Sequence, residues 1–114
     1  MRTWNRTAVV VVPKQPFLDW LRSVDPTSAD LTLENLSADP TVYLLAEAQS
    51  DSAADRLLAA ACENIFEEQL DSWHHAPESW PKDRRIRTFR QWFTYSFHSM
   101  IIDLCDRPLQ AEEL

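Results

Sequence analysis

Glycine is absent from the 114 residues. Average usage of about 7% would place about eight glycines in a chain of this length. Walker A phosphate loops, GxGxxG dinucleotide-binding turns and GxSxG hydrolase elbows all need glycine, because a Cβ atom would block the tight turn or the close backbone approach. The lack of glycine therefore excludes these common nucleotide-binding and hydrolase motifs.

Cysteines and long apolar runs are also scarce. Cys62 and Cys105 stand far apart without a CxxC spacing, so we expect reduced thiols rather than a disulfide. The apolar run Ala8–Val12 is shorter than a signal-peptide core, and nothing approaches the roughly 18 apolar residues of a membrane span. We therefore expect a cytoplasmic protein with no membrane partner.

Basic residues are outnumbered, with 11 Lys and Arg against 18 Asp and Glu and a net charge of −7. This balance argues against a nucleic-acid partner. From Asp30 to Glu78 there are eleven acids and one base, whereas Ser79 to Thr94 holds five bases and one acid. Each stretch can be the solvated face of a helix. Together they can also form a dipolar surface that steers a charged partner.

Residue periodicity predicts three strands and four helices in a single domain over residues 1–114, with a frayed tail at 108–114. The expected strands are Ala8–Val12, Thr41–Leu45 and Phe97–Leu104. The expected helices are Pro16–Val24, a short one in Thr32–Ala38, Ser52–Trp73, and one that begins at Pro81 and includes Phe93. The predicted fold class is α/β, with α+β as the alternative. We expect a two-layer sandwich in which helices pack on a small mixed sheet, in the order β-α-(α)-β-α-α-β.

Two of these segments carry more specific expectations. Ala8–Val12 is apolar on both faces of a strand, which suits a strand covered on both sides rather than an exposed edge. Ser52 followed by Asp55 resembles a capping box, so Ser52 is the expected N-cap of the long helix.

Aromatic and basic residues are interleaved in the last third of the chain. Core packing by Ile86, Phe89 and Phe93 explains many of the aromatics, but five tryptophans exceed what so small a core needs. Tryptophan and arginine are enriched in the hot spots of protein interfaces. The leading hypothesis is therefore a non-enzymatic protein–protein interaction module. The predicted contact residues are Trp80, Arg84, Arg87 and Trp92.

The alternative hypothesis is a small-molecule-binding protein or an enzyme with a histidine-containing cleft. Its candidate residues are Lys14, His74, His75 and His98. The weaker third hypothesis is single-stranded nucleic-acid binding through the basic helix. A homodimer formed through exposed aromatic side chains is compatible with all three.

No catalytic residues, metal site or cofactor are expected. His74 and His75 lie near Asp71 and Glu78, but adjacent histidines tend to point apart and the spacing matches no zinc motif. His98 and Ser99 would point to opposite faces of one strand and so could not form a nucleophile–base pair.

Five strings of the sequence together resemble a family of small uncharacterised bacterial proteins of about this length. They are Pro-Lys-Gln-Pro-Phe-Leu-Asp-Trp-Leu (13–21), Asp-Pro-Thr-Val-Tyr-Leu (39–44), Ile-Phe-Glu-Glu (65–68), Trp-Pro-Lys-Asp-Arg (80–84) and Trp-Phe…Phe-His-Ser-Met (92–100). The resemblance spans nearly the whole chain and implies a bacterial cytosolic protein. It implies no activity and no site residues.

Overall fold

The computed structural model describes all residues 1–114, and its centre is the apolar run at residues 8–12. This run lies in β2 (Arg6–Pro13), the middle strand of a three-stranded sheet with the order β3-β2-β4. β3 spans Thr41–Ala46 and β4 spans Phe93–His98. Val10 of β2 pairs with Val42 of β3 on one side and with Ser96 of β4 on the other.

Both pairings are antiparallel, where a mixed sheet was expected. The antiparallel direction follows from the positions at which β3 and β4 begin. β3 begins opposite Val11 and β4 begins opposite Pro13, so both strands start at the end of the sheet where β2 finishes. A parallel neighbour would need a crossover back along the whole strand.

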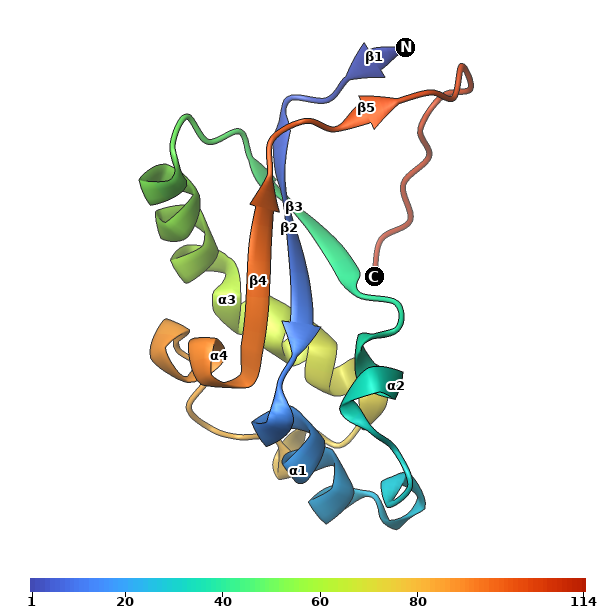
Figure 1. The fold of residues 1–114 in the computed structure, drawn as a ribbon, viewed down its shortest axis with the longest axis vertical. Helices are drawn as coiled ribbons and strands as arrows, with labels where there is room; N and C mark the ends of the chain where they lie inside the picture. The colour runs from blue at the N-terminus through green and yellow to red at the C-terminus, as the bar shows by residue number, and fades with distance from the viewer.

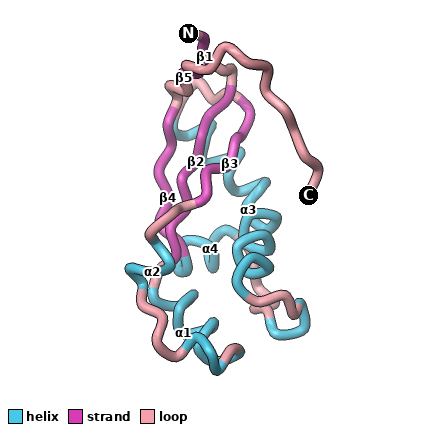
Figure 2. The backbone as a smooth tube through the Cα atoms, turned by 90° about the vertical axis from the view of Figure 1, so that its right-hand side faces the viewer, coloured by secondary structure: helices cyan, strands magenta, loops and turns pink.

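The helices follow the predicted order, which confirms an α+β fold with helices packed on a small sheet. Their bounds are α1 Gln15–Val24, α2 Leu33–Ser37, α3 Asp51–Trp73 and α4 Ile86–Trp92, with single 3₁₀ turns at Pro26–Ser28 and Pro77–Ser79. In Figure 1, α3 crosses behind the three strands, and Figure 2 shows the strands and α3 as separate layers. None of these helices is long and apolar enough to cross a membrane.

The core lies between the helices and one face of the sheet, which we call the inner face. Val9 and Val11 of β2 and Phe93 of β4 point to this face and are fully or almost fully buried. α3 and the other helices complete the core with apolar side chains, among them Phe17, Leu18, Leu21, Leu58, Cys62, Ile65, Phe66, Leu70 and Phe89.

Two predicted helix starts are wrong. The N-cap of α3 is Ser50, whose side chain accepts a hydrogen bond from the backbone of Ala53, so the helix begins one residue before Ser52. α4 begins at Ile86 rather than at Pro81. In a helix from Pro81 the backbone N–H of Arg85 would donate to the carbonyl of Pro81, but it donates to the side chain of Asp83 at 3.2 Å instead. The carbonyl of Pro81 accepts from the side chain of Arg84, and residues 81–85 stay irregular.

The third predicted strand is also displaced. β4 already begins at Phe93 and ends at His98, because alternate side chains from Phe93 onward enter the core with the period of a strand. The chain then leaves the sheet and forms β5 (Ile102–Asp103), which pairs antiparallel with β1 (Arg2–Thr3). This two-stranded ribbon projects beyond the end of the sheet in Figure 1. Residues 104–114, which include the predicted tail, are exposed and have no helix or strand.

Candidate interaction surface

Arg84 connects the irregular segment 81–85 to α3. Its Nη2 atom donates a 2.8 Å hydrogen bond to Glu67 and lies 3.7 Å from a carboxylate oxygen of Glu63. Its Nη1 atom donates to the carbonyl of Pro81 at 2.8 Å. The guanidinium is therefore used within the fold, where it neutralises part of the acidic surface of α3.

The two predicted contact tryptophans are half-buried. The ring of Trp92 packs against Phe17, Trp20 and Phe66, with centroid distances of 6.1, 6.4 and 5.3 Å. The indole N–H of Trp80 donates to the carbonyl of His74 at 3.1 Å, just beyond the end of α3. Both side chains thus contribute to packing, and only part of each faces solvent.

Arg87 is the predicted contact residue with a free side chain. It lies on α4, is exposed, and makes no hydrogen bond or ion pair. It lines a hollow of about 520 Å³ together with Arg85, Asp83 and Gln91. Hydrogen bonds from Arg85 lower the pKa of Asp83 to about 2, so this carboxylate is ionised and offsets one of the positive charges.

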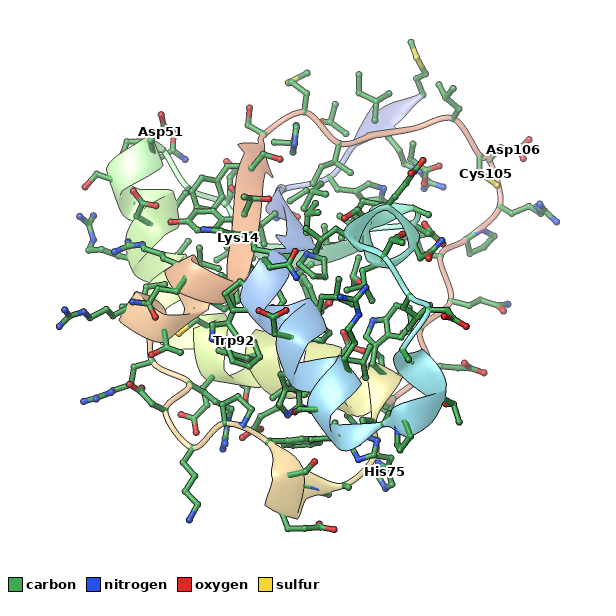
Figure 3. All side chains as sticks on the ribbon, turned by 60° about the horizontal axis from the view of Figure 1, so that its bottom comes forward. Lys14, Asp51, His75, Trp92, Cys105 and Asp106 are labelled. Atoms are coloured by element: carbon green, nitrogen blue, oxygen red, sulfur yellow. The ribbon has the colours of Figure 1, made fainter.

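The structure does not bring together the residues of the alternative ligand site. His98 pairs with Ala8 near the start of β2, whereas Lys14 follows the last residue of that strand. Lys14 and His75 also lie apart in Figure 3. The ring of His75 contacts Asp71 one turn earlier in α3, and the ring of His74 lies 6.2 Å from that of Trp20. The side chains of Lys14 and His98 therefore cannot share a cleft.

A partly buried polar cluster lies between β3 and α3. The hydroxyl of Tyr43 donates to the carboxylate of Glu68 and accepts a 2.8 Å hydrogen bond from the side-chain amide of Gln69. Burial, together with the hydrogen bond to Glu68, raises the pKa of the Tyr43 phenol well above its usual value. The cluster joins the edge strand to the long helix, and the raised pKa is explained by this structural role.

The face of the sheet that points away from the helices was not predicted as a site. We call it the outer face, and in Figure 1 it faces the viewer with no helix over it. Its ten positions are Arg6, Ala8, Val10, Val12, Val42, Leu44, Ala46, Thr94, Ser96 and His98. None of them is Asp or Glu, and Arg6 at the first position of β2 is the only Lys or Arg, although these four residue types make up 25% of the chain.

The outer face is more apolar than a solvent-facing sheet normally is. Antiparallel sheets with one solvated face place polar residues on it. Here Val42 and Leu44 are 55% and 58% exposed on the edge strand β3. The central positions Val10 and Val12 are partly covered by these neighbours. The sequence contained a signal for this apolar outer face, because the run Ala8–Val12 is apolar on both faces of the strand. The helices cover only the inner face.

Comparisons with known proteins add no assignment, since no family model, no curated protein and no solved structure matches the chain. The resemblance to small uncharacterised bacterial proteins stays a prediction.

Proposed function

We propose that the protein is a non-enzymatic protein–protein interaction module that binds through the outer face of its sheet. The observation that supports this most strongly is the exposure of Val42 and Leu44 on a face whose only charged side chain is that of Arg6, at the first position of β2. Exposed apolar patches of this kind mark interaction sites on soluble proteins. The open face of a sheet suits a protein partner better than a small molecule, which needs a concave site.

Of the predicted contact residues, Arg87 has an exposed side chain without a partner in the fold, and it lies on α4 rather than on the outer face. Substitution of Arg84 by Glu would place a third carboxylate beside Glu63 and Glu67, so loss of binding in that variant could reflect a damaged fold. Arg87→Glu reverses a charge that has no partner in the fold. This single substitution is the cleaner test of the basic segment.

The surface hollows do not favour the ligand-binding alternative. The five main hollows have volumes of 220 to 520 Å³, and none is lined by Lys14 or by a histidine. Nucleic-acid binding would have to overcome the net charge of −7. We therefore propose neither.

The module is tested by co-expressing two differently tagged copies of the chain in bacteria and capturing one of them at low and high salt. We expect a stoichiometric protein, either the second copy or another protein, whose capture persists at high salt and is lost in Leu44→Lys. Ala60→Lys is the matched control, because it adds the same charge at an exposed position on α3. Equal capture by both variants, or the bait alone at both salts, would contradict the proposal.

The same experiment tests the basic segment. If Arg87 adds a separate electrostatic contact, Arg87→Glu should capture less of the partner than wild type at low salt, and this difference should shrink at high salt, where the contact of the outer face persists. Capture that is unchanged in Arg87→Glu would remove this residue from the interaction surface.

A further inference from the structure

We propose that the outer face of the sheet is covered by a second copy of the chain, so that two three-stranded sheets pack face to face with the helices outside. This inference rests on the proposed function, because it names the occupant of the same face. It is argued from charge, from the symmetry of the face and from the area that a stable dimer needs.

Charge favours a second copy. The net charge is −7, so two copies repel each other unless they meet where neither carries acidic side chains. The outer face is such a surface, since its only ionisable side chains are those of Arg6, at the first position of β2, and His98, and neither is acidic. Two copies can therefore meet through this face without bringing carboxylates together.

The arrangement of side chains suits a two-fold interface. In a two-fold dimer each protomer presents the same patch, so the patch must be self-complementary. Val10, Val42 and Ser96 form one row across the three strands, and Ala8, Leu44 and His98 form the next. In the second row the small, buried Ala8 on β2 thus lies between the larger Leu44 on β3 and His98 on β4. When two sheets pack about 10 Å apart, the room over Ala8 of one sheet can accept Leu44 of the other.

The sheet alone is too small for a stable interface. With strands about 4.8 Å apart and same-face residues about 6.8 Å apart along each strand, ten positions cover roughly 330 Å². A typical specific interface buries about 800 Å² on each partner. A dimer therefore needs surface beyond the three strands.

The ribbon of β1 and β5 supplies further apolar surface. Met100, Ile102 and Leu104 follow directly from β4 and are 70%, 52% and 78% exposed. The ribbon projects beyond the end of the sheet (Figure 1), and the radius of gyration is 15.6 Å, whereas about 13 Å is typical of a compact chain of this length. This segment packs little against its own protomer, so it is available to extend the contact with a second copy.

The test is sedimentation equilibrium of the full chain from 1 to 200 µM, with three proteins: wild type, Leu44→Lys and Ala60→Lys. We expect wild type and Ala60→Lys to approach twice the monomer mass of 13.3 kDa, and Leu44→Lys to dimerise at least tenfold more weakly. Circular dichroism and thermal unfolding of each variant verify the fold, which should persist because Leu44 is more than half exposed.

Two results would overturn the inference. A wild-type protein that stays monomeric at 200 µM would exclude the second copy. The proposed function would then survive only if the capture experiment found another protein that is lost in Leu44→Lys. A dimer that is equally strong in Leu44→Lys and Ala60→Lys would show that the copies meet elsewhere, for instance along the free edge of β3 or β4.

Discussion

Truncation of Phe66 should remove a large part of the folding free energy. Its side chain is fully buried on α3, and its ring centroid lies 5.1 Å from that of Phe93, 5.3 Å from that of Trp92 and 6.1 Å from that of Phe89. Phe→Ala substitutions in cores cost about 3–5 kcal/mol, and loss of three aromatic contacts favours the upper half of that range. The total stability of such domains is only about 5–15 kcal/mol.

Urea unfolding of Phe66→Ala, followed by tryptophan fluorescence at low protein concentration, measures this loss. With a urea dependence of about 2 kcal/mol per molar, a loss of 4 kcal/mol lowers the midpoint by about 2 M. Leu44→Ala is the control, because its side chain is more than half exposed and its removal should cost under about 1 kcal/mol. A Phe66→Ala midpoint within about 0.5 M of wild type would refute the packing described for the core.

Three further predictions concern a helix cap, a half-buried phenol and the two thiols. Because Ser50 caps α3, Ser50→Ala should lower the free energy of unfolding by about 1 kcal/mol, whereas Ser52→Ala should leave it nearly unchanged. Equal losses in the two variants, measured by urea unfolding, would contradict Ser50 as the cap. Tyr43→Phe should cost about 1–3 kcal/mol at pH 7. The folded state raises the pKa of the Tyr43 phenol, so the extra free energy of unfolding of wild type over Tyr43→Phe is complete below about pH 10 and should shrink as the pH rises further. A difference in unfolding free energy that stays constant up to pH 11 would contradict this. Ellman's reagent should react at once with the exposed Cys105, but with Cys62 only on unfolding, because burial shields that thiol and raises its pKa; two fast thiols in the native protein would contradict the buried position.

The elements that sequence periodicity predicts well are those in which one pattern runs for several turns or residues. β2, α1 and the body of α3 have such patterns, and their segments are predicted to within one or two residues of their observed bounds. The strand β3 is equally clear because residues 41–45 are rich in β-branched and aromatic side chains.

The errors fall where a local signal competes with a tertiary contact. Proline favours the first turn of a helix, so Pro81 was a reasonable start for α4. The position of the start is set instead by Arg84, which binds both Pro81 and Glu67 on α3, and a contact 17 positions apart leaves no trace in local periodicity. The ribbon of β1 and β5 has two residues in each strand, too few to form a period.

The candidate surface was difficult to predict for a different reason. Composition placed the interaction surface in the aromatic and basic segment near residue 84. In the structure, Trp92 packs on the core and Arg84 pairs with α3, while Val42 and Leu44 stay exposed. Period-two alternation shows that these two side chains share a face. It does not show that every helix packs on the opposite side, because that depends on where the connections return the chain.

The most direct test of the outer face as a covered interface is paramagnetic relaxation of methyl signals by a soluble gadolinium chelate, measured at about 1 mM protein. If a second copy covers the face, the methyl groups of Val10 and Val42 should be shielded in the wild type and strongly relaxed in Leu44→Lys, while Ala60 on α3 is relaxed in both. Strong relaxation of Val10 and Val42 in the wild type would show that the outer face is open to solvent and would contradict the interface proposed here.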